Sequence, residues 1–179
     1  MSSVASVYAQ ALYGLKKEAG TAEAVLEQLA ALDESFSQEP AFVRLLSAAN
    51  ISKAERCEIL DQSFRGKIDL DLLSFMKILT EKGYMRHFSD CVKAFRQLYN
   101  EDNGILDVQA VSAVVLTQQQ KDRLCEKLAA ITGKRISLQN CIDPACLGGI
   151  RLNYDGKQVD DTLQHRLSSI KALLSETVL

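Results

Sequence analysis

The residue types best suited to chemistry in this 179-residue chain are a pair of carboxylates and a histidine near its C-terminus. Asp160 and Asp161 are adjacent, and His165 follows them in a helical pattern. A catalytic site needs groups that converge on one point, whereas adjacent residues at the start of a helix diverge. The oxygens of these aspartates and of Thr162 are typical of a helix N-cap, where acidic residues suit the positive end of the helix. Capping is therefore the favoured interpretation, and the alternative is a small cytosolic hydrolase or metal-dependent enzyme that uses Asp160, Asp161 and His165.

The paired glycines Gly148 and Gly149 are a second candidate for a functional motif. A phosphate-binding loop places its glycines before a helix N-terminus, with a lysine and a serine or threonine behind them. Here the glycines precede a predicted strand, so nucleotide binding is not favoured. A bulge, or a close backbone approach that leaves no room for a side chain, is the better interpretation.

The five cysteines are odd in number and include no C-x-x-C pair, and the chain has only two histidines. This spacing does not favour a zinc site. In a cytosolic chain the thiols are most simply small apolar residues that stay reduced, although Cys141 and Cys146 could approach one another across the turn at Pro144. We expect no cofactor, no metal and no catalytic residue, and the chain is interpreted as a non-enzyme. The cysteines are Cys57, Cys91, Cys125, Cys141 and Cys146.

The composition excludes several classes of protein. A hydrophobic content of 47% supports one large or two small folded domains. A net charge of −2 does not provide the basic face of a nucleic-acid binder. No apolar run approaches the roughly 20 residues needed to cross a bilayer, and the first residues lack the basic and apolar regions of a secretory signal. We therefore expect the chain to start folded, in the cytosol.

Apolar residues spaced three and four apart predict six short helices before Gly104. The first has an apolar stripe over residues 4–15 and ends near Gly20, and the fifth runs from a cap at Asp69 to a stop at Gly83. The second has an apolar stripe that ends at Phe36, and the sixth carries apolar residues from Met85 to Tyr99. A capping box, Ser52-x-x-Glu55, predicts the start of the fourth. Six short helices with brief links predict a compact bundle over residues 1–104.

The spacing of apolar residues changes after Gly104, from the helical period to the alternation of a strand. Leu106, Val108 and Ala110 alternate within a stretch rich in β-branched residues, which predicts a strand. A second capping box, Thr117-x-x-Gln120, predicts a helix after this strand, with an apolar stripe through Leu124, Leu128 and Ile131, and a further strand follows it.

Residues 150–159 predict a β-hairpin. Ile150, Leu152 and Tyr154 alternate with polar residues, as in a strand with one buried face. The pair Asp155-Gly156 suits a type I′ turn before a short return strand, and an apolar stripe after it predicts an amphipathic terminal helix over residues 163–174. The predicted fold class is mainly α (α+β). It comprises an N-terminal six-helix bundle and a small mixed C-terminal domain, residues 105–179, with a β-hairpin and a terminal helix.

Motifs at both ends of the chain resemble one family. The run LGGIRL, the hairpin and the Asp160-Asp161-Thr162 segment are similar to the C-terminal signature of the F-type ATP synthase delta subunit, the family of the oligomycin-sensitivity-conferring protein. YAQALYGL, residues 8–15, resembles the first-helix motif of that family. E-K-G at residues 81–83 and N-G at residues 103–104 also sit where the family places them. The resemblance covers essentially the whole chain.

The resemblance implies a non-catalytic stator subunit with two partners. The N-terminal bundle would bind the N-terminal helix of an alpha subunit at the top of the catalytic head, and the C-terminal domain would bind the peripheral-stalk b subunits. The protein would then resist torque during rotary, proton-driven ATP synthesis. The implied location is the cytoplasmic face of the bacterial inner (plasma) membrane, reached only through the complex, and no nucleic acid is involved. The implied stalk-domain motif is Gly148, Gly149, Arg151, Asp160 and Thr162.

The predicted fifth helix carries more apolar residues than one stripe needs. The pattern alone favours a central helix buried on all sides, and the alternative is a helix with two faces, of which Leu72, Met76 and Leu79 form the core face. The resemblance favours two faces, because the family receives the N-terminal helix of the alpha subunit in a groove between its first and fifth helices. An amphipathic helix in such a groove is a known mode of recognition. The implied groove residues are Tyr8, Ala11, Leu15, Phe75, Ile78 and Lys82.

Overall fold

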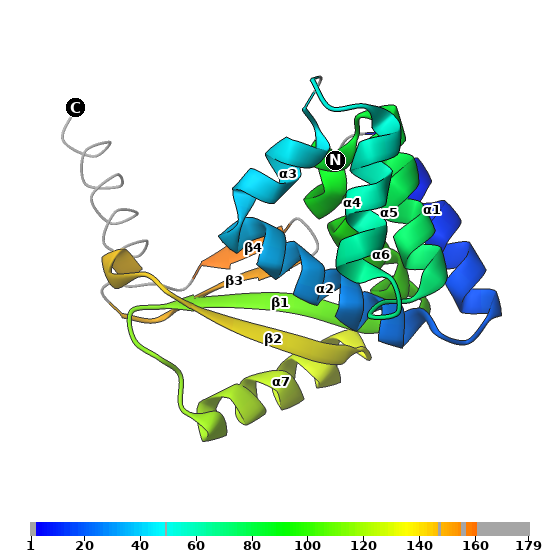
Figure 1. Ribbon diagram of the computed structural model, residues 1–179. Helices are drawn as coiled ribbons and strands as arrows, with labels where there is room; N and C mark the ends of the chain where they lie inside the picture. Colours follow the sequence, from blue (N-terminus) through cyan, green and yellow to red (C-terminus); the bar gives the residue numbers. More distant parts are fainter. Residues whose placement is uncertain (1–2, 49, 147, 155–156, 161–179) are drawn as a thin grey trace, which may run out of the picture. The chain divides into compact units, whose positions relative to one another are not determined.

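The computed structural model describes residues 3–48, 50–146, 148–154 and 157–160. These residues are mostly helical, with one small mixed sheet of four strands (Figure 1). The chain divides into two compact units, Met1–Tyr99 and Asn100–Leu179, and each is described by itself. The division falls inside the last turns of the sixth helix, just before the predicted boundary at Gly104.

The first unit contains the predicted helices, and their ends follow local sequence signals. Ser52 and Glu55 form the predicted capping box, in which the Ser52 hydroxyl accepts from the Glu55 N–H and the Glu55 carboxylate accepts from the Ser52 N–H. Asp69 caps the fifth helix by accepting from two backbone N–H groups. The helices are α1 (Ser3–Glu18), α2 (Ala22–Gln38), α3 (Pro40–Leu46), α4 (Lys53–Phe64), α5 (Leu70–Lys82) and α6 (Phe88–Asp102).

The predicted sixth helix does not begin at Met85. Gly83 adopts a left-handed conformation with φ of 76° and ends α5. The N–H of Gly83 donates to the Thr80 carbonyl and that of Tyr84 to the Leu79 carbonyl, which is the bonding of a Schellman motif. One turn of 3₁₀ helix, Met85–His87, follows before α6 starts. The chain must redirect after this stop, so the first residues of the predicted helix form a connector.

One hydrophobic core joins the six helices of the first unit. The predicted stripe of α2, which ends at Phe36, is buried. The Phe36 ring packs against Phe42, Phe64 and Phe88, with ring centroids 5.1–6.2 Å apart. Such aromatic contacts contribute beyond simple area burial.

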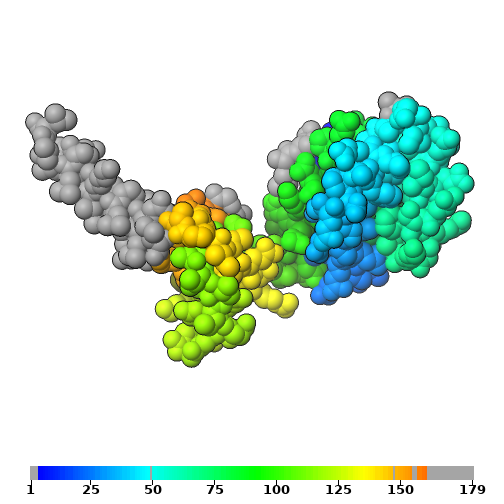
Figure 2. Space-filling view, turned by 60° about the vertical axis from the view of Figure 1, so that its left-hand side comes forward, coloured from blue at the N-terminus to red at the C-terminus, as the bar shows by residue number. Residues whose placement is uncertain are grey.

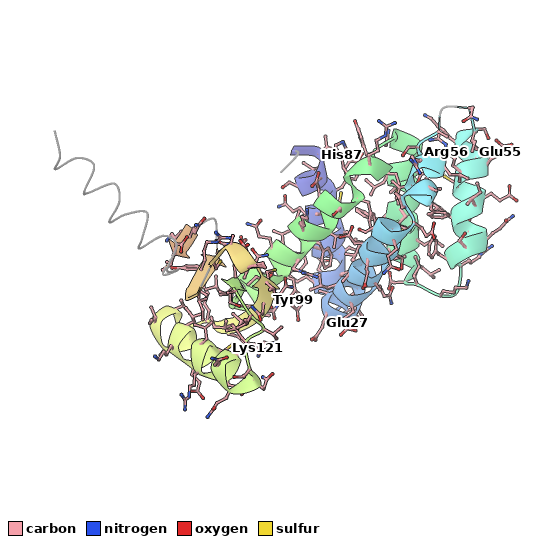
Figure 3. The ribbon with its side chains drawn as sticks, turned by 90° about the vertical axis from the view of Figure 1, so that its left-hand side faces the viewer. Glu27, Glu55, Arg56, His87, Tyr99 and Lys121 are labelled. Atoms are coloured by element: carbon pink, nitrogen blue, oxygen red, sulfur yellow. The ribbon has the colours of Figure 1, made fainter. Side chains whose placement is uncertain are left out.

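Arg56 of α4 is a cation buried within this unit (Figure 3). Its Nη1 donates to the carbonyl of Leu46, the last residue of α3, at 3.0 Å. A cation at a helix C-terminus satisfies an orphan carbonyl and complements the negative end of the helix. Arg56 therefore ties α4 to the end of α3.

The second unit is built on a sheet with the strand order β2-β1-β3-β4. β1 (Ile105–Ser112) and β2 (Arg135–Ile142) are parallel and are connected by α7 (Gln118–Thr132), whose N-terminus carries the predicted capping box. β3 (Ile150–Tyr154) pairs antiparallel with β1 and with β4 (Lys157–Asp160), which confirms the two strands of the hairpin. The turn residues 155–156 and the predicted terminal helix lie outside the described residues.

Burial in the sheet follows the prediction in β1 and departs from it in β3. Leu106, Val108 and Ala110 are buried, as their alternation predicted. All five residues of β3 are half-buried, so the expected contrast between one buried and one open face is absent from this strand. Helix α7 packs against β2, which is the edge strand on the other side of β1 from β3.

Candidate functional site

The predicted partner-binding residues lie on two helices of the first unit that pack directly against each other, α1 and α5. Figure 1 shows these helices side by side. We call the surface formed by Tyr8, Ala11 and Leu15 of α1 and by Ile78 and Lys82 of α5 the α1–α5 face. These α1 positions follow a spacing of three and four residues, and those of α5 are four apart, so each set lies along one side of its helix.

Two contacts hold α1 and α5 antiparallel. Near the end of α1, the Lys16 ammonium lies 2.7 Å from the Asp69 Oδ1 and 2.7 Å from the Asp71 Oδ2, at the start of α5. Near the start of α1, the Tyr8 ring lies 6.0 Å from that of Tyr84, just beyond the end of α5. Tyr8 forms one of these contacts, and the other residues of the α1–α5 face lie between the two.

The contact at Lys16 is electrostatically tight because the ammonium is almost fully buried, with 4% of the residue's surface exposed. Burial by itself would lower the pKa of Lys16, but the hydrogen bonds to Asp69 and Asp71 outweigh burial and raise that pKa above its usual value. Burial would raise the pKa of Asp69, but the bonds from Lys16 and from the backbone N–H groups of Leu72 and Asp71 lower it. Lys16 and Asp69 are therefore both charged at neutral pH.

Ile78 and Leu15 are exposed apolar residues, with 45% and 50% of their surfaces accessible. Ala11 and Lys82 are also exposed, and Tyr8 is half-buried. Phe75 differs from the prediction, because only 6% of its surface is accessible and it belongs to the core. It lies three residues after the buried Leu72, on the part of α5 that the neighbouring helices cover.

Helix α5 therefore has a core face and an open face. Leu72, Met76 and Leu79 are completely buried, at the positions assigned to the core. Ile78 and Leu70 are exposed on the same helix, with 71% of Leu70 accessible. A helix buried on all sides does not describe this arrangement.

Two residues of α1 beside the face were missed from the sequence. Val7 is 65% exposed, and it precedes Ala11 and Leu15 at a spacing of four residues that could have revealed it. Gly14 lies inside the helix, and a Cβ built on it would meet no atom within 4 Å. A glycine at an open helical position is a local signal, because alanine there would favour the helix.

The predicted stalk-domain motif is described only in part. Gly149 has a left-handed φ of 82°, which favours glycine, and Gly148 lies beside it before β3. Arg151 donates to the Asp143 carboxylate at 3.4 Å and is the register partner of Asp160 across β3 and β4.

Asp160, the first of the predicted cap residues and of the carboxylate pair in the enzyme alternative, is the last residue of β4 and is the register partner of Arg151 in β3. A residue with strand geometry can cap a helix that follows it, so its capping role stays a prediction. Asp161, Thr162 and His165 lie outside the described residues.

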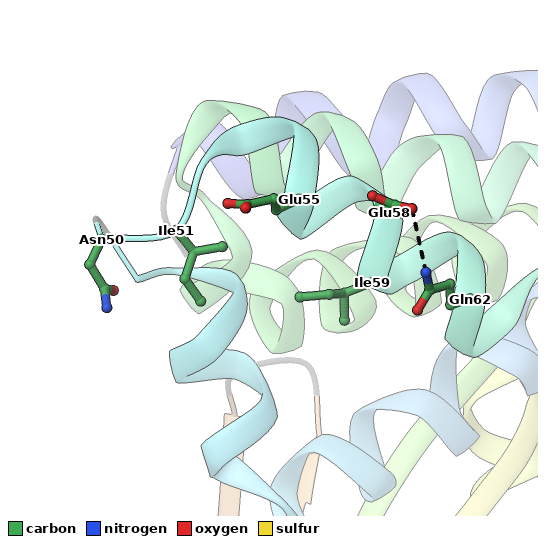
Figure 4. Close-up of a pocket in the computed structure, with 6 residues that line it drawn as sticks. All are labelled: Asn50, Ile51, Glu55, Glu58, Ile59 and Gln62. Carbon is green, nitrogen blue, oxygen red and sulfur yellow. Dashed lines mark hydrogen bonds between the residues drawn. The ribbon is translucent and has the colours of Figure 1, made fainter.

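Two pockets of the first unit contain none of the predicted site residues. One of about 440 Å³ is formed by α4 and the loop before it, where Gln62 donates to Glu58 at 3.5 Å and Glu55 is engaged in its capping box (Figure 4). The other, of about 460 Å³, is apolar and includes Phe36 and Phe42; it lies on α2, α3 and α4, blue to turquoise in Figure 2. The first pocket is lined by two carboxylates, Glu55 and Glu58, and the described linings of both pockets contain no histidine, lysine or cysteine.

The thiols and carboxylates form no metal centre within the part of the chain that the structure describes. All five cysteines are free. Burial raises the pKa of the Cys91 thiol to about 11, and burial followed by the nearby Glu81 charge raises that of Cys57. Among the described helices, none is both long and apolar enough to cross a membrane.

Comparisons with known proteins identify the family. The family model for the ATP synthase delta (OSCP) subunit matches residues 4–174. The ATP synthase subunit delta of Alkaliphilus oremlandii is 31% identical over 173 residues, which cover 97% of this chain and 96% of that protein. The ATP synthase subunit delta of Lactobacillus gasseri is 32% identical over 174 residues, which cover 97% and 95%.

A solved structure shows the same fold. A chain in the cryo-EM structure of the Toxoplasma gondii mitochondrial ATP synthase hexamer matches with a TM-score of 0.77 and 16% identity, over 96% of this chain and 97% of that chain. The family match over nearly the whole sequence and this common fold agree with the motifs at both ends of the chain. The chain therefore belongs to the ATP synthase delta (OSCP) subunit family, a family of non-catalytic stator subunits of the F-type ATP synthase.

Proposed function

We propose that this chain links the alpha/beta catalytic head of the ATP synthase to the peripheral-stalk b subunits, through one contact on each unit. The first unit, a six-helix bundle, would hold the N-terminal helix of an alpha subunit, and the second unit would hold the C-terminal ends of the b subunits. Linking two contacts in one chain raises the effective concentration of each. Such a linker resists torque without performing chemistry.

The open α1–α5 face carries the proposal for the first unit. Exposed apolar groups from both helices, Leu15 and Ile78, lie between contacts that fix the helices at each end. An amphipathic partner helix would cover these groups and gain their burial, while the anchored helices need little rearrangement. Phe75 supports the face from the core and does not contact the partner directly.

The second unit is proposed to bind the b subunits through the region after β2, which includes Gly148, Gly149 and Arg151. The support is the family membership together with the separate sheet of this unit. Thr162 is part of the same proposal. On this basis the protein would lie on the cytoplasmic face of a bacterial inner membrane, associated with the membrane only through the complex.

Titration of the full chain with a peptide of the N-terminal alpha helix segment, taken from the alpha subunit, tests the first contact. Capture by immobilised peptides from the C-terminal ends of the b subunits tests the second. We expect both partners to bind at once, with neither weakening the other. Binding of both partners by the same unit would contradict the proposed division. The hydrolase alternative has no support, because the family to which the chain belongs consists of non-catalytic subunits.

A further inference from the structure

The two ends of the α1–α5 face carry opposite charge. At the end where α5 begins, the single charge of Lys16 is shared by Asp69 and Asp71, so these three side chains together carry a net charge of −1. The Asp71 side chain remains 51% exposed, so this charge faces solvent. The neighbouring Lys17 and Glu18 cancel one another in charge.

At the other end, Lys82 is an exposed cation in the last turn of α5. Within the described part of the chain, no carboxylate pairs with it. The adjacent Glu81 is directed toward α4, where its Oε1 lies 3.8 Å from the Cys57 Sγ. The positive charge at this end is therefore available to a partner.

The spacing of these charges matches a helix. Asp71 and Lys82 are 11 residues apart on α5, which is about three helical turns and roughly 16 Å. Residues 11 apart on a partner helix also return to the same side, so one partner helix can place a charged group beside each of them. The exposed Ile78 lies between the two charges.

We propose that the α1–α5 face selects an amphipathic helix that carries a carboxylate and a cation 11 residues apart on its apolar side, with the carboxylate beside Lys82 and the cation beside Asp71. This inference rests on the proposed function of the face. Acidic residues favour the first turn of a helix and basic residues the last. The bound helix therefore runs antiparallel to α5, with its N-terminus near Lys82.

Two synthetic helical peptides with the same apolar residues test this selection on the full chain. The charged peptide carries glutamate in its first turn and lysine 11 residues later, and the neutral peptide carries glutamine at both positions. At low ionic strength, on the order of 0.01 M, screening is weak. Two exposed ion pairs predict roughly fivefold tighter binding of the charged peptide, and this preference disappears at about 1 M salt.

Charge-reversed variants test whether Lys82 is responsible for the tighter binding of the charged peptide. With Lys82→Glu, we expect the charged peptide to bind more weakly than the neutral one. Lys93→Glu, on the exposed side of α6, changes the net charge of the protein by the same amount and should leave the preference unchanged. A photo-crosslinker at the N-terminus of the charged peptide should react with residues 78–84.

Equal binding of the two peptides by the unmodified protein, an equal effect of the two lysine variants, or crosslinking at the Lys16 end would overturn the inference. In each case the neutral peptide still binds, so the proposed function stands. If neither peptide nor the N-terminal helix of the alpha subunit binds, the proposed function fails together with this inference.

Discussion

Replacing Ile78 with aspartate tests whether the α1–α5 face is a binding surface. Ile78 is already 45% exposed in the free protein. Complete burial of an isoleucine contributes about 1.5–3 kcal/mol, so removing a residue that is roughly half buried should cost about 1 kcal/mol of unfolding free energy. The new carboxylate would sit in water, four residues before Lys82, where an ion pair along the helix is mildly favourable.

The same substitution should affect binding much more than stability. A helix lying on the face would cover position 78 and remove water from the new charge, which then has no buried partner. The lost apolar contact and the desolvated charge together should exceed about 2 kcal/mol, as at a binding hot spot. The Kd for a peptide of the N-terminal helix of the alpha subunit, measured by calorimetric titration, should therefore rise by roughly 30-fold or more.

Two further variants serve as controls. Met76 is completely buried on the same helix, so Met76→Asp should destabilise the protein by about 3–5 kcal/mol in urea unfolding, because an unpaired charge enters the core. Leu45 of α3 is 38% exposed outside this face, and Leu45→Asp should leave peptide binding unchanged. If Ile78→Asp unfolds the protein as severely as Met76→Asp, position 78 is not open. If the Ile78→Asp variant binds the peptide with an unchanged Kd, the partner helix binds a different surface of the protein.

Four other predictions concern single features of the structure. Gly14→Ala should raise the unfolding free energy by about 0.5–1 kcal/mol, because the added Cβ meets open space in a helix. Urea unfolding measures this free energy, and a decrease would mean that the space around Gly14 is not open. The lowered pKa of Asp69 predicts a contribution to stability that is present above the unfolded pKa of about 3.9 and is lost as pH falls through the lower folded value. Lys16→Met should move this loss of stability to higher pH, as measured by acid unfolding followed by circular dichroism. An unchanged unfolding profile would contradict the ion pairing. Cys91 should resist iodoacetamide at pH 8 until the protein unfolds, because its thiol is buried and its pKa is about 11. Rapid labelling of the native protein, measured by mass spectrometry, would refute this. A reductant or a chelator should likewise leave the thermal midpoint of unfolding unchanged. Truncation before Gly148 removes β3 and β4 from the second unit only. Capture by peptides of the b subunits should therefore be lost, while the N-terminal helix of the alpha subunit still binds. A folded truncated protein that no longer binds that helix would show that the two contacts are not divided between the units.

The sequence by itself determined the secondary structure wherever the signal lies within a few neighbouring residues. Ser52 with Glu55 and Thr117 with Gln120 start helices because each pair satisfies backbone N–H groups of its own first turn. Gly83 ends α5 because glycine reaches the left-handed conformation at little energetic cost. Family membership was also predictable, since its motifs at both ends of the chain are runs of neighbouring residues.

Contacts between distant segments were decided only by the tertiary structure. Phe75 and Ile78 were assigned to one face of α5, yet Phe75 is buried in the core while Ile78 stays open. Their spacing of three residues leaves both within one side of the helix, and only the positions of the neighbouring helices decide which is covered. In the same way, Ile131 continues the predicted apolar stripe of α7 but is 81% exposed.

The site depends on such distant contacts. Lys16 joins Asp69 and Asp71 across more than fifty residues of sequence, and no local pattern marks a surface-type lysine as a buried cation. The parallel pairing of β1 with β2 and the placement of β3 on the other side of β1 are likewise choices made between segments. A helix cap is satisfied by atoms within one turn, whereas the burial of a side chain depends on elements that only folding brings beside it.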